Sequence, residues 1–185
     1  MKKLLTFFAA LLILFSFTLC TESHEDASTR YFRFLNGQQS DSLQLLLTPD
    51  FKVTLTYATY FYNRADFFSK YLKNLKDHNE KTRIVKTLSD KEPKQFLVED
   101  SSDYLKYLNI GNPTWIVTVK SQDDKISEVI VDTTKMSRQF FKDVKEKSDH
   151  FHEWLEKKYS YQSPSILFDT AGLLLKRLRE YKQEN

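Results

Sequence analysis

The stretch "RYFRFLNGQQSDSLQLLLTPDFKVTLT", residues 30–56, contains the pattern of elements from which we predict the fold. Tyr31, Phe34 and Leu35 stand at positions i, i+3 and i+4, which places three apolar side chains on one face of a helix. Gly37 follows directly, and glycine is the residue that most often ends a helix. The start of this stretch therefore predicts a short helix with an aromatic face.

The second half of the stretch predicts another short helix and then a strand. Ser40 is suited to cap the helix at its start, and Pro49 to end it. The apolar stripe between them consists of Leu43, Leu46 and Leu47. From residue 51 to residue 57, apolar and polar side chains alternate, as in a strand with one buried face. Two short helices thus lead into a half-buried strand.

The next part of the chain predicts a longer helix and further strands. The helix opens with Asn63 as its cap, and Asp66 lies in its first turn, where a negative charge is favourable. Its apolar face includes Phe68, Tyr71, Leu72 and Leu75. Two strands then flank a turn at Pro93, and a short helix follows in "SSDYLKYLN", residues 101–109.

A β-hairpin is the clearest single element, in "PTWIVTVKSQDDKISEVIVDTT", residues 113–134. Its first arm places Trp115, Val117 and Val119 on one face, and Val129 and Val131 of the second arm can pair with them across a turn. The opposite face carries Thr118, Glu128 and Asp132. After the hairpin, a long helix is expected over residues 137–159, and a last helix carries Leu174, Leu178 and Tyr181.

The order of these elements resembles the nuclear transport factor 2 superfamily, which includes SnoaL-like polyketide cyclases and ketosteroid isomerases. The resemblance covers about residues 28–133 and is carried by residues 30–56 and by the hairpin "WIVTVKSQDDKISEVIV". It implies an α+β fold, in which a cone-shaped, curved, mixed or antiparallel sheet is combined with N-terminal helices. The "SSDYLKYLN" segment interrupts the usual succession of strands, and residues 137–185 form a C-terminal helical extension beyond the common fold.

The resemblance also implies a pocket between the curved sheet and the first helices. Tyr31, Tyr57 and Trp115 are candidates to line it, because each is large and carries one polar atom. Ordinary core packing is the alternative for all three. Enzymes of the superfamily usually place an Asp, Glu or His in the cone, but the inward positions assigned here carry no carboxylate. Glu128 and Asp132 would point inward only if the register were shifted by one residue.

The histidines and glycines argue against several other kinds of site. His150 and His152 are two residues apart on a helix, so their side chains diverge and do not form a metal-binding pair. We interpret His78, at a helix end, as a surface residue, and His24 lies in a polar segment. With three glycines in the chain, phosphate-binding loops are excluded. No metal site and no cofactor are expected, and the case for an enzyme is open but weak.

The N-terminus has the three parts of an export signal. Lys2 and Lys3 precede an apolar run over residues 4–20, and a polar segment follows. Cys20, the single cysteine, is a candidate for lipidation, but a lipobox requires a small residue where this chain has Leu19. A cleaved signal peptide, a bacterial lipoprotein and a retained N-terminal membrane anchor therefore stay open, and mass spectrometry of the mature N-terminus distinguishes them. Each predicts a periplasmic, secreted or envelope-anchored protein.

Four segments follow from this interpretation: a signal over residues 1–20, a polar linker over 21–27, the cone domain over 28–136, and the helical extension over 137–185. Without the two N-terminal lysines, 26 basic residues balance 25 acidic ones, so no nucleic-acid partner is expected. The predicted role is binding of a small apolar ligand or of a protein partner, with a homodimer included. The alternatives are an isomerase-like or cyclase-like enzyme, and an envelope protein that assembles through its tail helices.

Overall fold

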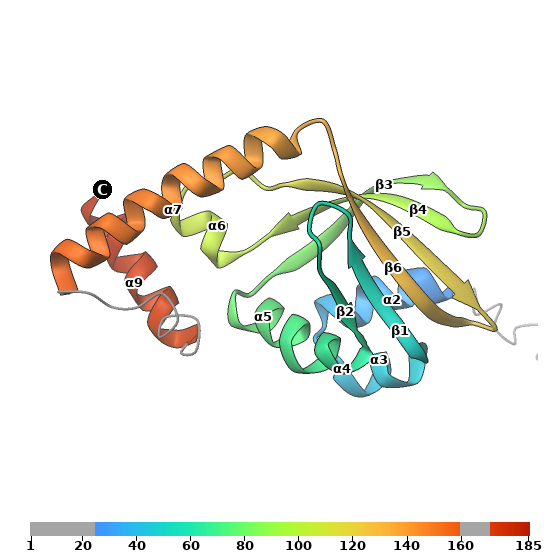
Figure 1. Ribbon diagram of the computed structural model, residues 1–185. Coiled ribbons are helices and arrows are strands. Elements are labelled where there is room, and N and C mark those ends of the chain that lie inside the picture. The colour runs from blue at the N-terminus through green and yellow to red at the C-terminus, as the bar shows by residue number, and fades with distance from the viewer. Residues whose placement is uncertain (1–24, 160–170) are drawn as a thin grey trace, which may run out of the picture.

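The computed structural model describes residues 25–159 and 171–185 (Figure 1). The predicted export signal of residues 1–20, with Cys20, lies outside the described residues, as does the predicted break "SYQSPS" over residues 160–165. Within the described ranges, no helix has both the length and the apolar character that a membrane crossing requires. Export and lipidation therefore stay predictions.

Helix α2 (Ala27–Asn36) is the first predicted helix, and it begins earlier than its aromatic stripe suggested. The Asp26 side chain caps it by accepting hydrogen bonds from the backbone N–H groups of Ser28 and Thr29. The helix ends at Gly37 as predicted, although the left-handed backbone conformation falls on Gln38, with φ of 53°. A Cβ atom at Gly37 would lie 3.2 Å from the carbonyl oxygen of Arg33, so close approach explains this glycine.

Helix α3 (Ser40–Leu46) differs from the prediction at both ends. Its cap position is Gln39, which makes no side-chain capping bond, so the assignment of Ser40 as the cap was wrong. Pro49 does not end the helix but lies inside strand β1 (Leu47–Leu55). A proline is tolerated there because the register of β1 against its neighbour is interrupted between Leu47 and Lys52.

In the described part of the chain, six strands form one curved sheet, in the order β2-β1-β6-β5-β4-β3 (Figure 1). Strands β1 and β6 run parallel, and the other neighbours are antiparallel. The remaining strands are β2 (Phe61–Asn63), β3 (Lys81–Ser89), β4 (Lys94–Ser101), β5 (Thr114–Gln122) and β6 (Lys125–Thr133). The prediction of an α+β fold with a curved mixed sheet is confirmed, but β2 was missed because three residues are too few to show alternation.

The predicted hairpin is formed by β5 and β6. Val117 pairs with Val131, and Val119 with Val129, so the predicted facing side chains are correct. On the opposite face, Glu128 forms salt bridges with Lys52 at 3.2 Å and Lys120 at 2.6 Å. The register is therefore not shifted, and Glu128 stays on the outer side of the sheet.

The predicted long helix over residues 63–79 forms as three consecutive pieces. They are α4 (Arg64–Asp66), a π-helical turn (Phe67–Tyr71) and α5 (Leu72–Asp77). Asn63 caps the first piece by accepting a hydrogen bond from the Asp66 backbone N–H at 2.9 Å, as predicted. Phe67 has no exposed surface and lies at the centre of an aromatic cluster, within 6.5 Å of the rings of Tyr31, Phe51, Phe68 and Tyr71.

The C-terminal helical extension forms part of a second, smaller core. It combines α6 (Asp103–Tyr107), which is the "SSDYLKYLN" segment, with α7 (Ser137–Tyr159) and α9 (Ala171–Glu184) (Figure 1). Leu174 and Leu178 of α9 are buried against Phe151 and Leu155 of α7. The apolar stripe of the last helix is thus covered by its own chain, and the interrupting segment forms part of the surface on which the tail docks.

Candidate functional site

A cavity of about 460 Å³ lies on the concave side of the sheet, under the helices. Its wall is mainly aromatic and aliphatic, contributed by the sheet, by α2, by the helical segment before β3, and by α6 and the start of α7. The residues of α7 that line the cavity are Phe140, Phe141 and Val144. Tyr57 and Phe141 line the cavity while keeping 41% and 39% of their surface exposed, so they mark its opening to solvent.

The structure places Tyr31, Tyr57 and Trp115 on the wall of this one cavity. Tyr57 stacks on Trp115 with ring centroids 5.2 Å apart, and Phe141 closes against Tyr57 at 5.4 Å. Tyr31 is only 2% exposed and also belongs to the packed aromatic cluster. This residue therefore both lines the cavity and packs in the core. Contact of these three side chains with a ligand stays a prediction.

Two carboxyl groups line the cavity, which corrects the expectation that none would point inward. Asp100 of β4 lies opposite Thr82 of β3, and the Thr82 hydroxyl donates a 2.6 Å hydrogen bond to its carboxylate. Glu80 immediately precedes β3. Strand β3 is held to helix α2 by Asn36, whose side-chain amide bonds the Thr82 carbonyl oxygen at 2.7 Å and the Thr82 N–H at 2.8 Å.

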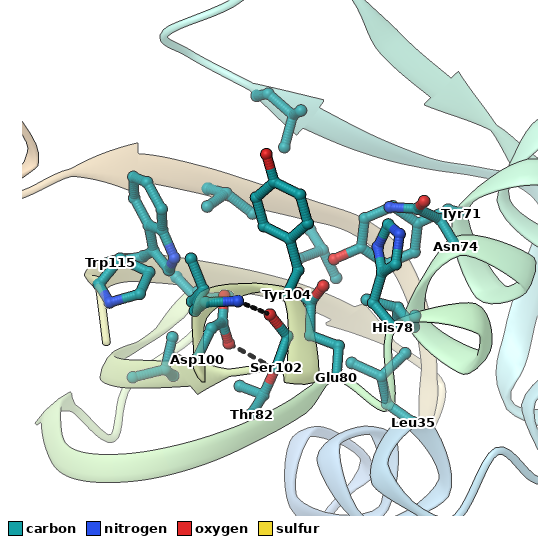
Figure 2. A pocket seen from close by; sticks show the side chains of 18 of the residues that line it. Leu35, Tyr71, Asn74, His78, Glu80, Thr82, Asp100, Ser102, Tyr104 and Trp115 are labelled. Atoms are coloured by element: carbon teal, nitrogen blue, oxygen red, sulfur yellow. Dashed lines mark hydrogen bonds between the residues drawn. The ribbon is translucent and has the colours of Figure 1, made fainter. Parts of the chain in front are cut away.

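The polar groups divide between two sides of the cavity in the view of Figure 2. Asp100 lies with Thr82 and Trp115, and the Trp115 side chain also hydrogen-bonds the Asp100 carboxylate. His78, Asn74 and Tyr71 lie on the other side, and Glu80 and Tyr104 lie between the two groups. Both sides are reached from the same cavity, so one bound molecule could contact both.

Burial raises the pKa of Glu80 to about 8, and the nearby charge of Asp100 adds to this effect. Burial also raises the pKa of Asp100, although the hydrogen bonds from Thr82 and Trp115 act in the opposite direction. At neutral pH, Glu80 is therefore mainly protonated and can donate a hydrogen bond or a proton. Glu80 and Asp100 lie in different environments. Such a difference allows one carboxyl group of a site to act as an acid and the other as a base.

His78 also lines the cavity, so its interpretation as a surface residue was wrong. Its ring lies 5.9 Å from the ring of Tyr104, and burial lowers its pKa. A neutral imidazole can accept a proton, which makes His78 the second group here suited to acid–base chemistry. His150 and His152 are on α7 and are not part of the cavity wall, and His24 lies outside the described residues.

The tyrosines of the cavity remain neutral over the physiological range. Burial raises the pKa of Tyr57 to about 12 and raises that of Tyr71 well above its usual value. Their hydroxyl groups can therefore donate hydrogen bonds to a bound molecule. Among residues 25–159 and 171–185, no group of three or more His, Cys, Asp and Glu side chains is arranged to hold a metal ion.

Sequence reasoning missed Glu80 and Asp100, although a signal for Asp100 was available. Phe96 and Val98 are buried on the concave face of β4, and Asp100 continues the same alternation. Glu80 stands two residues before Thr82, so the same alternation places it on the side of β3 that carries Thr82. No comparable signal existed for α7, because its position over the cavity depends on the second core.

No model of a known protein family matches this sequence, and no curated protein matches it. Among solved structures, IdmH from Streptomyces antibioticus, a proposed polyketide cyclase, shares 9% identity with a TM-score of 0.50. The alignment covers 64% of this chain and 96% of IdmH.

Two further structures show a similar arrangement. An NTF2-like protein of unknown function from Cytophaga hutchinsonii shares 10% identity over 62% of this chain and 91% of its own, with a TM-score of 0.46. A proposed ketosteroid isomerase from Kribbella flavida shares 19% identity over 59% of this chain and 76% of its own, with a TM-score of 0.47. This chain therefore has a nuclear transport factor 2-like fold, as the sequence pattern predicted.

Proposed function

We propose that this protein binds a small, largely apolar molecule inside the cone. The observation that carries the proposal is the cavity of about 460 Å³, whose aromatic wall opens to solvent beside Tyr57 and Phe141. Small-molecule sites have volumes of roughly 300–1,000 Å³, with mainly apolar walls and a few polar groups. Glu80, Asp100 and His78 supply such polar groups here. The side chains of the described residues do not fill this space, which favours a small ligand over plain core packing.

The proposal is tested with N-phenyl-1-naphthylamine, a neutral dye whose fluorescence rises in apolar surroundings. We expect the wild-type protein to enhance the dye's fluorescence and the Val131→Trp variant to lose this enhancement, because residue 131 lines the cavity and the larger ring would fill it. Ile130→Trp is the matched control, since Ile130 is its neighbour on β6 and does not line the cavity. Equal binding by both variants, or none by the wild type, would contradict the proposal.

Acid–base catalysis on the bound molecule is a second candidate function. The raised pKa of Glu80 favours it, because a protonated carboxyl beside a neutral histidine can exchange protons with a ligand. The probe is 2-acetylnaphthalene in deuterated buffer, where catalysis would replace the protons next to its carbonyl group by deuterium. This candidate requires faster exchange with the wild-type protein than with Glu80→Gln, and equal rates would exclude this role of Glu80.

A further inference from the structure

We infer that the ligand of this cavity is an organic cation, in which an alkylammonium group is attached to an apolar body. The inference rests on the proposed function, because it names the chemical class that the same cavity would bind. The juxtaposition that supports it is a pair of carboxyl groups, Glu80 and Asp100, under a wall of aromatic rings, with no Lys or Arg among the described lining residues.

The charged side chains of the cavity wall are acidic. The cavity lining includes two carboxyl groups but no Lys or Arg among the described residues, although the chain contains 28 basic residues. Several carboxylates elsewhere in the described ranges have basic partners in salt bridges, as in the pairs Lys70–Asp66, Lys73–Asp77, Arg83–Glu99, Lys94–Asp26 and Lys120–Glu128. Burial and the charge of Asp100 both act on Glu80, and no Lys or Arg side chain of the described residues offsets them. A cationic ligand would supply the missing charge.

The aromatic wall fits the same class of ligand. Cations bind over the faces of Trp and Tyr rings, and the attraction grows where water is excluded. Trp115 and Tyr57 stand beside Asp100 at one side, and Tyr62 and Tyr71 line the opposite part of the cavity. Alkylammonium groups combine a diffuse positive charge with apolar surface, so they suit both the rings and the carboxylates. A bare metal ion would leave most of this apolar wall without a partner.

Binding of a cation should be coupled to release of a proton. The cation favours the ionised form of Glu80, which is mainly protonated in the free protein at neutral pH. The other titratable groups facing the cavity are Asp100 from β4, His78 after α5, and the tyrosines Tyr31, Tyr57, Tyr62, Tyr71 and Tyr104. None of them carries a positive charge at pH 7, since burial lowers the pKa of His78. Affinity for a cation should therefore increase with pH until Glu80 is ionised.

The test compares benzyltrimethylammonium with neopentylbenzene, in which carbon replaces the charged nitrogen and the shape is retained. The readout is the NMR signal of the two indole N–H groups. Trp115 lines the cavity, while the indole N–H of Trp154 donates to Glu184 in the second core and serves as an internal reference. We expect the Trp115 signal alone to shift, and the affinity for the cation to rise about tenfold per pH unit between pH 6 and pH 8.

Variants separate the charge of Glu80 from its shape. Glu80→Gln should weaken binding of the cation at pH 8 and reduce its pH dependence, with a much smaller effect on binding of neopentylbenzene. Glu156→Gln is the matched control, because Glu156 is exposed on α7 and does not line the cavity. If neopentylbenzene binds as tightly as the cation at every pH, this inference is wrong and the proposed function stands. If neither compound shifts the Trp115 signal, both proposals fail.

Discussion

Replacing Phe67 by alanine should lower the free energy of unfolding by about 3–5 kcal/mol, the range found for truncated buried aromatic residues. Phe67 has no exposed surface, and its ring lies 5.0 Å from Phe51 and 5.4 Å from Tyr71. It holds the helical segment before β3 against α2 and β1, so the surrounding rings cannot easily close the space. Urea unfolding followed by circular dichroism measures the loss.

Phe61→Ala is the control for this experiment. Phe61 is 54% exposed on strand β2 and belongs to neither buried core. Its truncation should cost less than about 1 kcal/mol, as is usual for exposed positions. If the two variants lose equal stability, then the aromatic cluster around Phe67 does not anchor the fold as the structure indicates.

Stability should fall as the pH rises towards 8, and Glu80→Gln should remove most of this fall. The pKa of Glu80 is about 8 in the folded protein, and its usual value in an unfolded chain is 4.5. Between these values the folded state holds a proton that the unfolded state has released. The free energy of unfolding therefore decreases through this window, by an amount on the order of a few kcal/mol.

The measurement is a series of urea unfolding curves from pH 5 to pH 9 for the wild type and the variant. Asp100, whose pKa is also raised by burial, contributes in the same direction and is retained in Glu80→Gln, so a smaller slope should remain. Glu156→Gln, an exposed position on α7, is the control and should keep the wild-type slope. Identical slopes for the wild type and Glu80→Gln would show that Glu80 is not held in its protonated form.

The fold could be predicted from the sequence where local patterns and tertiary packing agree. The hairpin is the best example, because the alternation around Val117 and Val131 determines both the strands and the facing residues. The helix after Asn63 was predicted for the same reason. Its π-helical turn was not, because one additional residue in a helical turn leaves no mark on an apolar stripe.

The candidate site was predicted only in part, and the physical reason is clear. The size and spacing of aromatic residues are visible in the sequence, so Tyr31, Tyr57 and Trp115, which line the cavity, could be named as candidates. Glu80 and Asp100 were not named, because charged residues at the ends of strands are usually exposed. Their burial depends on α6 and on the start of α7, which cover this end of the sheet, and no local pattern records that arrangement.

Helix α7 has one end in each of two packed regions. Phe140 and Phe141 lie at the cavity, and Phe151 and Leu155 lie in the core formed with α6 and α9. The cavity is therefore not complete within residues 28–136 alone. Removal of α7 would take away part of the cavity wall together with the second core.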